Sequence, residues 1–538
     1  MRRLKGTDGK LRPGRGGRES GKGGGPAPCA EDAARRRFLL ALPGIAAPLL
    51  AGPSVLGGTL RPQPRPGAEA GRAVASRGGR ASSVLAGSPL ADKTACLAVD
   101  TATGAVILAH RSDAFLPPAS VTKILTALYG LETLGADYRF ATRLEVNGPV
   151  EGGRIRGDVV LAGGGDPTLD TRGLAELAAR LAAAGVREIE GRFLFDEHAL
   201  PQLRALAADQ PITAAYNPGL SGLNLNFNRV HFSWERRSAG LALALDARAG
   251  PLRPGVGCIT IEAAERASPV YRYRIEADRA ERWSVARRAL GRRGSRWLPV
   301  RLPGRYAADV FRTLARSHGI VLPPPLPAAG ARDGFRVLVG IESEPLDRVL
   351  KGMLRYSTNL TAEAVGLRAT HRRTGRVPPG LARSAEVMAD WARHRFGLTR
   401  LSLHDHSGLH DATRISPREL MTVLRDGRAR EMLLPLLKEV KPGQLARRRE
   451  RRPVRTRGHV RAKTGTLHFV SALAGYVEAA DGHLIAFVIQ SADLDRRARI
   501  DRRLTAPPAG ARRWKLRARE LQRALLIEWL DRAGGSGG

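Results

Sequence analysis

Residues 117–135 read PPASVTKILTALYGLETLG, a stretch that combines two prolines, a helical pattern of apolar residues and a final glycine. After two prolines, apolar side chains recur at helical spacing, at Ile124, Leu128 and Leu131. Proline is tolerated in the first turn of a helix, and glycine commonly follows the last one. The stretch therefore predicts a helix that starts close to Ser120 and ends before Gly135. Positions i and i+3 of a helix share one face, so this helix would place Ser120 beside Lys123.

A serine followed three residues later by a lysine can form a nucleophile and its base. A serine hydroxyl attacks a carbonyl only when another group takes its proton, and a buried lysine can do so once desolvation lowers its pKa from roughly 10.4. Arginine cannot, because it keeps its proton in proteins. Only ten of the 88 lysine and arginine residues are lysines, which makes Lys123 informative. Taken alone, the pattern also fits a surface lysine on an amphipathic helix.

Two further short motifs follow along the chain. Ser357-Thr358-Asn359 opens a second helical run, and Lys463-Thr464-Gly465-Thr466 leads into a predicted hairpin. Separately, the first motif could be a helix cap and the second a charged residue on an edge strand. The order Ser-x-x-Lys, Ser-x-Asn, Lys-Thr-Gly, each on the kind of element that acyl transfer needs, is much less compatible with coincidence.

The segments around these motifs predict a fold that mixes helices and strands. Four apolar runs predict two hairpins, 94–99 with 105–109 and 470–477 with 484–489. A last helix over 510–532 has an apolar stripe wide enough to cover a sheet. Strands at both ends, with helices between them, indicate a sheet assembled from distant segments. Residues 146–335 alternate short strand patterns with turns and one helix at 174–184, which predicts an inserted β-rich domain.

The motifs and their surroundings resemble the low-molecular-mass penicillin-binding proteins of the D-alanyl-D-alanine carboxypeptidase/endopeptidase type, peptidase family S13. The resemblance covers roughly residues 93–530 and rests on PASVTK at 118–123, GGGDPTL at 163–169, YSTN at 356–359, DHSGL at 405–409 and AKTGTL at 462–467. It implies the α/β (α+β) class and a penicillin-binding transpeptidase/serine β-lactamase-like fold. That fold has a five-stranded antiparallel sheet and a helical subdomain, and this family adds a large insertion between the first two motifs.

The same resemblance implies a role for each motif residue in catalysis. Ser120 would be the acylated nucleophile and Lys123 the acceptor of its proton. Ser357 would relay the proton to the leaving amine, and Asn359 would hold both Lys123 and the substrate amide. Lys463 would supply positive electrostatic potential.

Substrate binding is implied for a second set of residues. Thr464 would bind the terminal carboxylate, with Gly465 and Thr466 beside it. The backbone N–H groups of Ser120 and Thr466 would form the oxyanion hole. Asp196, in the run Phe-Asp-Glu, would receive the ammonium group of the stem peptide. We expect no metal and no cofactor, peptidoglycan peptides as substrates, and β-lactam antibiotics as covalent inhibitors.

Two other functions share part of this pattern. Serine β-lactamases also carry Ser-x-x-Lys and Lys-Thr-Gly, but the long insertion and the Ser-x-Asn helix favour the peptidase. A non-catalytic peptidoglycan-binding scaffold could keep the fold. The complete set of Ser120, Lys123, Ser357, Asn359 and Lys463 argues against that alternative.

Two clusters outside the motifs suggest ligand sites that we do not favour. Histidines and aspartates gather at His404, Asp405, His406, His410 and Asp411, but five potential ligands within eight residues rarely converge on one metal ion, so a polar turn is expected. The glycines at 163–165 lack the Gly-Lys-Ser/Thr sequence that completes a phosphate loop.

The chain departs from the family directly after DHSGL. Relatives usually continue with Ser-Arg, whereas this chain has His410-Asp411. An arginine there resembles a ligand for the acidic end of the stem peptide. We therefore expect Asp411 to reverse the local charge and to weaken binding of a free diaminopimelate carboxylate, unless Arg414 compensates.

The amino terminus predicts export. Residues 1–34 are Gly-rich and basic and are interpreted as a disordered leader, and 35–60 resemble a twin-arginine signal in which no charged residue follows the arginines at 35–37. A membrane anchor is the alternative, and only an uncleaved signal would keep the protein at the membrane surface. A linker over 61–92 would precede the transpeptidase-like parts at 93–145 and 336–532, with a tail at 533–538. The expected location is the periplasm or cell envelope.

The net charge of +37 raises the question of nucleic-acid binding. The arginines are spread along the chain, aromatic residues make up only 5% of it, and no nucleic-acid-binding motif is present, so we expect no nucleic-acid partner. Cleavage of the signal would remove Cys29 and leave Cys96 and Cys258, which we expect to be structural, although in an exported chain they could pair.

Overall fold

The computed structural model describes residues 82–277, 280–329, 332–441, 458–478 and 483–533. All of them belong to one compact unit, residues 75–538. The expected leader, the expected signal and the greater part of the expected linker lie outside the described residues. Within the described ranges, no helix combines the length and the apolar composition that crossing a membrane requires.

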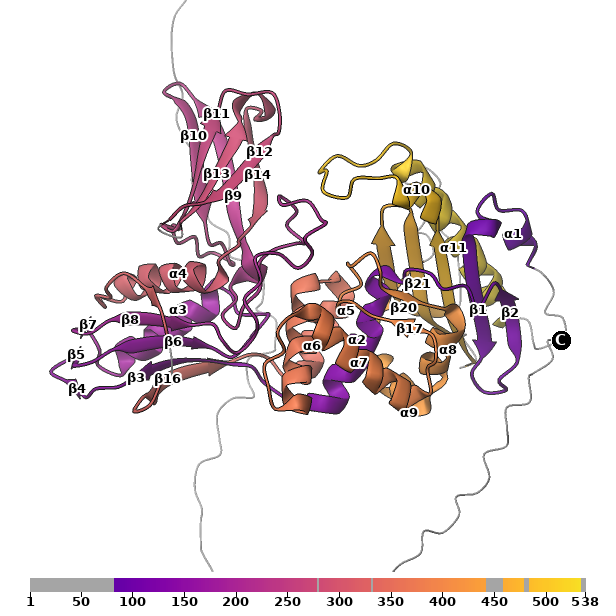
Figure 1. Ribbon diagram of the computed structural model, residues 1–538, viewed down its shortest axis with the longest axis horizontal. Coiled ribbons are helices and arrows are strands. Elements are labelled where there is room, and N and C mark those ends of the chain that lie inside the picture. Colours follow the sequence, from indigo (N-terminus) through magenta and orange to yellow (C-terminus); the bar gives the residue numbers. More distant parts are fainter. Residues whose placement is uncertain (1–81, 278–279, 330–331, 442–457, 479–482, 534–538) are drawn as a thin grey trace, which may run out of the picture. The chain divides into compact units, whose positions relative to one another are not determined.

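The main sheet is assembled from both ends of the chain, as predicted (Figure 1). Its strands, in spatial order, are β19 (Lys438–Glu439), β20 (His459–Leu467), β21 (Val470–Glu478), β22 (Leu484–Ala492), β1 (Thr94–Asp100) and β2 (Val106–His110). All neighbouring pairs are antiparallel. We expected five strands, and the two-residue β19 adds a sixth at the edge beside β20.

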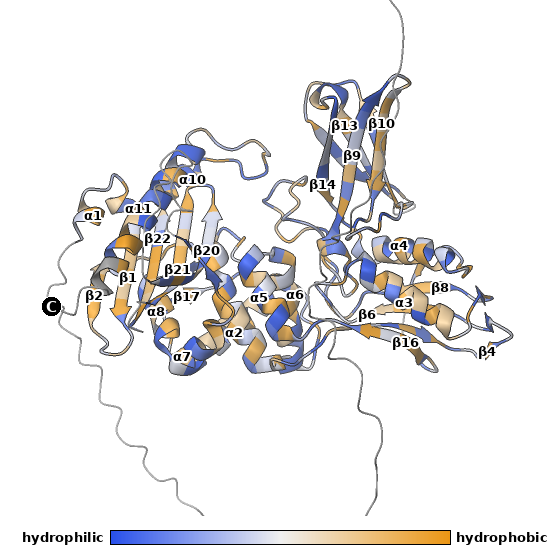
Figure 2. Cartoon of the chain, turned by 180° about the vertical axis from the view of Figure 1, so that it is seen from behind, coloured by the Kyte–Doolittle hydropathy of each residue, from blue (hydrophilic) through white to orange (hydrophobic). Residues whose placement is uncertain are grey.

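Alternating residues of these strands bury side chains on both faces of the sheet. Cys96 and Ala98 of β1 pack in the core beneath α11 (Ala511–Ala533), whereas Leu97 and Val99 pack in the core shared with the helical region. This period of two is the geometry of a strand covered on both sides. The hydropathy colouring shows apolar residues along β1 and β2, whereas β20 is paler (Figure 2).

The helical region surrounds α2 (Lys123–Leu134), which starts and ends as predicted. Helices from much later in the chain pack around α2: α5 (Leu346–Tyr356), α6 (Asn359–Thr374), α7 (Leu381–Phe396) and α9 (Gly427–Leu433). Figure 1 shows α2 among them in a colour from the opposite end of the sequence. The helix α8 (Pro417–Arg425) contacts β22 and β1, and the short strands β17 (Leu401–Ser402) and β18 (Arg414–Ile415) lie between these helices in sequence.

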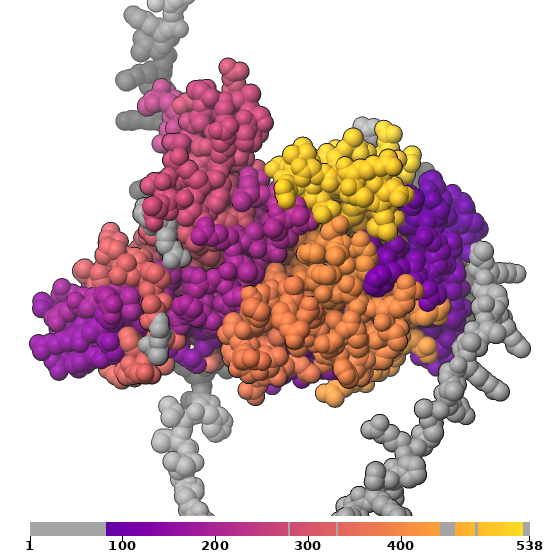
Figure 3. Space-filling view, in the orientation of Figure 1, coloured from indigo at the N-terminus to yellow at the C-terminus, as the bar shows by residue number. Residues whose placement is uncertain are grey.

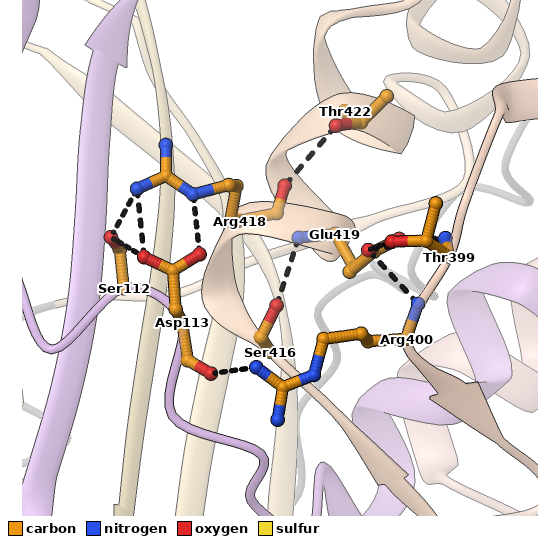
Figure 4. A network of polar contacts seen from close by, with 8 residues as sticks. All are labelled: Ser112, Asp113, Thr399, Arg400, Ser416, Arg418, Glu419 and Thr422. Atoms are coloured by element: carbon orange, nitrogen blue, oxygen red, sulfur yellow. Dashed lines mark hydrogen bonds and ion pairs between the residues drawn. The ribbon is translucent and has the colours of Figure 1, made fainter. Parts of the chain in front are cut away.

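A polar network anchors the start of α8 (Figure 4). Arg418 donates to both carboxylate oxygens of Asp113 over 2.6 and 2.9 Å. The Oγ of Ser416 accepts the N–H of Glu419, whose carboxylate accepts the N–H of Thr399. Exposed ion pairs stabilise a fold by at most about 1 kcal/mol each. The network nevertheless connects the segment after β2, which leads to the Ser120 turn, with α8 and the end of α7.

The inserted part contains one larger sheet, two smaller sheets and a small three-stranded ribbon. The larger sheet has the order β15 (Leu326–Pro327), β8 (Phe193–Asp196), β6 (Val159–Gly163), β3 (Ala141–Val146) and β16 (Arg336–Glu342). The helices α3 (Thr171–Ala183) and α4 (Pro303–Ser317) pack against each other and on this sheet. The sheet thus uses β3 and β16, which lie outside the boundaries expected at 146 and 335.

The two smaller sheets of the insert are three-stranded. One contains β10 (Gly240–Asp246), β9 (Arg229–Arg237) and β14 (Arg293–Pro299), and the other β11 (Ile259–Ala264), β13 (Glu281–Ala286) and β12 (Tyr271–Ile275). A small ribbon is made by β4 (Val150–Glu151), β5 (Arg154–Ile155) and β7 (Glu188–Ile189). The insert is therefore rich in β-structure, as expected.

Outside the motifs, the structure corrects one expectation and agrees with another. The linker was expected to run to residue 92, but α1 (Ser83–Ala86) already packs on α11, with Leu85 and Leu90 buried, because these side chains complete the apolar core beneath that helix. The boundary at residue 92 was therefore placed too late. Cys96 and Cys258 are buried free thiols in separate cores, so they are structural and do not pair.

Candidate active site

The sequence places Ser120 in a short turn of 3₁₀-helix, Ala119–Thr122, directly before α2. Ala119 has a φ of +47°, a left-handed conformation that is unfavourable for a residue with a Cβ and that often occurs at functional sites. The Nζ of Lys123 donates to the Oγ of Ser120 over 3.0 Å. The predicted pairing of these two side chains on one helical face is confirmed as geometry.

Lys123 is fully buried and has three acceptors. Besides Ser120, its Nζ donates to the Oδ1 of Asn359 and to the backbone carbonyl of Ser407, both over 2.8 Å. Burial lowers the pKa of Lys123 to about 8, against the opposing effect of the carboxylates of Glu363 and Asp405. A lysine with this pKa exchanges its proton close to neutral pH, as a general base requires.

The carbonyl of Ser407 is held in place by two buried carboxylates. Glu363 accepts the N–H groups of His406 and Ser407 over 2.9 and 3.0 Å, and Asp405 accepts those of Gly408 and Leu409 over 2.9 and 2.7 Å. Several backbone bonds to one turn fix its position. Asp405 lies in the DHSGL stretch that carries the family resemblance, but the resemblance did not reveal this supporting function.

Gly408 allows the turn to pass directly beneath the Ser120 turn. Its φ is +75°, and a Cβ there would lie 1.9 Å from the carbonyl oxygen of Ala119. Glycine is therefore required both by the backbone conformation and by the close approach. The carboxylate of Asp405 serves this turn, while His406 is buried with its Nε2 2.8 Å from the Oγ of Ser384. These partners fit the expected polar turn rather than converging ligands.

A second hydrogen-bonded lysine and serine come from two distant motifs. Ser357 ends α5 in a left-handed conformation, with φ of +60°, and its Oγ accepts from the Nζ of Lys463 over 2.9 Å. Lys463 also donates to the carbonyl of Thr464 over 2.6 Å. Burial and the positive charge of Lys123 hold the pKa of Lys463 well below its usual value. The two lysine and serine pairs are thus electrostatically linked.

Strand β20 approaches the Ser120 turn at Gly465. A Cβ on Gly465 would lie 2.6 Å from the carbonyl oxygen of Pro118 and 3.1 Å from the backbone nitrogen of Ser120. Real side chains do not tolerate the first of these distances, so the glycine permits the approach. It brings the backbone of Thr466, the next residue, into the neighbourhood of the Ser120 N–H, as an oxyanion hole made from both would require.

These groups open into one cavity of about 710 Å³. Its wall includes Ser120, Ser357, Asn359 and Thr466, together with Gln210 and Tyr216 from the insert. The lining also includes five cationic side chains, namely Arg497, Arg502, Arg512, Lys515 and Arg519. Nothing in the sequence distinguished these four arginines from the rest of the 78 in the chain.

Asp196 is not brought to this cavity. It lines a different cavity, where its carboxylate pairs with the Nη2 of Arg332 over 2.7 Å and with the Nδ1 of His198 over 2.7 Å. The structure thus places Asp196 in a cavity other than that of Ser120, with a cationic partner. Its expected substrate-binding role stays a prediction.

Asp411 does not leave a negative charge in the site. Its two oxygens pair with the Nε of Arg497 over 2.6 Å and the Nη1 of Arg502 over 3.1 Å. The expectation that Asp411 reverses the local charge is corrected, because Arg497 and Arg502 both pair with this carboxylate, and Arg502 pairs with Asp209 as well. The guanidinium group of Arg414 donates to the backbone carbonyls of Asp411 and Thr413.

The glycines at 163–165 serve packing rather than phosphate binding. The N–H of Gly164 donates to the carbonyl of Ala141 over 2.9 Å, and that of Gly165 to the carbonyl of Gly222 over 2.7 Å. A phosphate cradle needs such groups free to point at a ligand. The close approach of these backbones accounts for the glycines, since a Cβ on Gly164 would lie 2.5 Å from the same Ala141 oxygen.

Comparison with known proteins places this arrangement among the D-Ala-D-Ala carboxypeptidases. The chain is 27% identical over 430 residues to the D-alanyl-D-alanine carboxypeptidase of Actinomadura sp. (strain R39), covering 73% of this chain and 76% of the relative. It is 25% identical over 403 residues to the D-alanyl-D-alanine carboxypeptidase DacB of Haemophilus influenzae, covering 71% and 82%.

A solved structure shows the same fold. The crystal structure of penicillin binding protein 4 from Haemophilus influenzae superposes with a TM-score of 0.63 at 20% identity, covering 80% of this chain and 96% of that one. The expected penicillin-binding fold is thereby confirmed. A sequence model of the D-Ala-D-Ala carboxypeptidase 3 (S13) family matches residues 81–506, which include all three motifs. The chain belongs to the D-Ala-D-Ala carboxypeptidase 3 (S13) family of serine peptidases.

Proposed function

We propose that the chain hydrolyses D-Ala-D-Ala-containing peptidoglycan peptides through an acyl-enzyme on Ser120. The hydrogen bond between Ser120 and the fully buried Lys123 carries this proposal. It joins a nucleophile to a base whose pKa, about 8, suits proton transfer near neutral pH. The family assignment supports the substrate class.

Acylation begins when neutral Lys123 takes the proton of the Ser120 hydroxyl. The Oγ forms a bond to the carbonyl carbon of the penultimate residue, and the negative charge that develops on the carbonyl oxygen is stabilised by backbone N–H groups of Ser120 and Thr466. Such donors each contribute about a hundredfold or more. The C–N bond then breaks, and the proton that Lys123 took passes through Ser357 to the leaving amine, which makes Lys123 neutral again. Lys463 holds Ser357 at 2.9 Å.

Deacylation returns the enzyme to its starting state. Water attacks the ester carbon, and Lys123 accepts a proton from that water. The bond between the carbon and the Oγ breaks, and the Oγ recovers a proton as the acid product leaves. Net hydrolysis consumes one water and no cofactor. A β-lactam contains a strained amide and would acylate Ser120 by the same first steps, so we propose these antibiotics as covalent inhibitors.

The charges of the cavity support acidic peptides as substrates. Five cationic side chains line it, and the carboxylates of Asp411 and Asp209 that contact Arg497 and Arg502 only partly balance them. A surplus of positive charge in a concave site favours anionic ligands. This property fits a peptide that ends in a carboxylate and carries further acidic groups.

The location that we propose is the periplasm or cell envelope. The support comes from the arginines at 35–37 followed by an uncharged stretch, and from a substrate class that lies outside the cytoplasm. Replacing all three arginines with lysine should block export through the twin-arginine route. Unchanged export of that variant would point to a different export route or to an anchor.

The function is tested by product analysis. Purified protein should release D-Ala from monomeric peptidoglycan fragments, and mass spectrometry of cross-linked fragments would establish whether it also cleaves cross-links. The Ser120→Ala variant should form neither product. Product formation that persists at the wild-type rate in Ser120→Ala would contradict the proposal.

A further inference from the structure

One wall of the Ser120 cavity comes from a loop of the insert, residues 203–217, which we call the insert loop. It follows β8 and precedes β9, and its residues Gln210 and Tyr216 line the cavity. The carbonyl oxygen of Tyr216 accepts a hydrogen bond from the Nδ2 of Asn359 over 3.1 Å. The backbone of the insert thus contacts a residue of the catalytic set directly.

That contact determines which end of the Asn359 amide faces Lys123. An amide has an accepting oxygen and a donating nitrogen, and its orientation follows from the partners of both. In Asn359 the Nδ2 is directed to the Tyr216 carbonyl, so the Oδ1 is left to accept from Lys123 over 2.8 Å. A displaced Tyr216 carbonyl would remove this constraint and weaken an acceptor of the Lys123 ammonium group.

The insert loop is anchored by apolar contacts near its start and by polar contacts further on. Leu206 and Ala207 are buried in one apolar cluster with Leu360 of α6, whereas Ile212 is 50% exposed and Tyr216 is 47% exposed. On the side towards the C-terminal segment, the loop has polar contacts. Asp209 pairs with Arg502 over 2.8 Å, and the hydroxyls of Thr213 and Thr505 lie 3.1 Å apart. The space-filling view shows this part of the insert against the C-terminal segment (Figure 3).

A buried arginine from another part of the insert also holds the loop. Arg301, between β14 and α4, is 1% exposed, and its guanidinium donates to three loop carbonyls. The acceptors are Arg204 at 2.8 Å, Asn217 at 2.7 Å and Ile212. Charge-assisted hydrogen bonds from a rigid, planar group fix several backbone positions at once. Asn217 is the residue directly after Tyr216.

Arg301 is itself held by its backbone. Its N–H and that of Leu302 both donate to the Oε1 of Glu281 over 2.8 Å. A second arginine, Arg296 on β14, makes one bond to the loop, to the carbonyl of Thr213 over 3.0 Å. Of these two arginines, Arg301 therefore makes more hydrogen bonds to the loop.

We propose that Arg301 is a positioning residue of the active site, which acts through the insert loop and the Tyr216 carbonyl on the orientation of Asn359. The inference rests on the proposed function. Arg301 touches neither the nucleophile nor its base. Its effect on the reaction is transmitted by the backbone of the insert loop, so the insert takes part in acylation.

The test compares acylation of Ser120 by penicillin in full-length variants. Arg301→Met should lower the second-order acylation rate constant by between about tenfold and a hundredfold, because small displacements of catalytic groups have effects of this size. Arg301→Lys keeps the charge and some of the bonds and should lie between Arg301→Met and the wild type. Arg293→Met, an exposed substitution on β14, is the matched control and should behave as the wild type.

The pH profile separates positioning from simple loss of stability. The Oδ1 of Asn359 stabilises protonated Lys123, so a loosened Asn359 should move the rise of the acylation rate with pH to lower pH. The other charged groups around Lys123 are Glu363, Asp405 and Lys463, and all remain in the variants. A variant that is merely less stable would contain less folded, reactive protein, but the pH at which its acylation rate rises would not change.

Each outcome decides the inference. A folded Arg301→Met variant with the wild-type rate and pH profile would overturn it. If Arg301→Met does not fold, Arg296→Met decides, because it removes one bond to the loop. It should show a smaller decrease and a shift in the same direction, and an unchanged profile would overturn the inference. Absence of acylation in the wild type would instead refute the proposed function.

Discussion

The Nζ of Lys463 donates to the Oγ of Ser357 over 2.9 Å. A similar pair, Lys123 and Ser120, lies 3.0 Å apart in the same site. The partners of the first pair are 106 residues apart and those of the second only three. The two lysines have different surroundings: Lys123 has the carboxylates of Glu363 and Asp405 near it, whereas the charges that act on Lys463 are positive. Similar geometry therefore supports different roles.

Substituting each lysine with arginine should separate these roles. Lys123→Arg keeps the charge but not the removable proton, so acylation of Ser120 should be lost while the fold remains. Lys463→Arg should cause a milder decrease, because its proposed role is mainly electrostatic. Acylation rate constants of both variants, with circular dichroism to verify folding, test this. Equal losses would argue against separate roles.

The rate of acylation should depend on pH through Lys123. Its pKa is lowered by burial to about 8, and only the neutral amine can accept the serine proton. The second-order rate constant should therefore rise with pH up to about 8 and, well below that value, fall about tenfold per pH unit. Stopped-flow measurements between pH 5 and about 9 provide the profile. A rate that is independent of pH across this range would exclude Lys123 as the base.

Gly465 should be indispensable for the approach of β20 to the Ser120 turn. A Cβ at this position would lie 2.6 Å from the carbonyl oxygen of Pro118, so Gly465→Ala must displace the strand or the turn. Misplacement of the oxyanion-hole donors should lower acylation by about a hundredfold. Gly352→Ala in α5 is the control, because a Cβ there meets no atom within 4 Å. Comparable activity of both variants would contradict the proposed close approach.

The pairing of Asp411 with two arginines changes the expected substrate preference. Asp411 and Asp209 balance Arg497 and Arg502, and the cavity carries three further cationic side chains, Arg512, Lys515 and Arg519, so a stem peptide with a free acidic group should be preferred over its amidated form. At a partly exposed site this preference is on the order of 1 kcal/mol, or about fivefold in kcat/KM. Arg502→Gln should reduce it. A wild type that does not discriminate between the two peptides would instead support the expectation from the sequence.

The sequence predicted what depends on short-range geometry. The proximity of Ser120 and Lys123 follows from three positions along a helix, and the two hairpins follow from alternating apolar runs. The meeting of Lys463 with Ser357 could be inferred only through the resemblance to a family, since no local rule connects residues so far apart. The burial of Lys123 likewise depends on helices that come from much later in the chain.

The sequence did not predict the partners of charged residues when those partners are distant along the chain. Asp196 and Asp411 were interpreted as isolated carboxylates, but Arg332 and Arg497 neutralise them. In a chain with 78 arginines, periodicity and composition do not reveal which arginine meets which carboxylate. The sequence did not reveal Arg301 for the same reason, because its proposed role depends on hydrogen bonds to three backbone carbonyls and not on a motif.

The most direct test of the account is to identify the residue that penicillin modifies. The protein would be incubated with labelled penicillin and digested, and the labelled peptide sequenced by mass spectrometry, with Ser120→Ala as the control. We predict a single adduct on Ser120, in the peptide that contains PASVTK, and none in the variant. An adduct on Ser357, or no adduct on the folded wild-type protein, would contradict the assignment of Ser120 as the nucleophile.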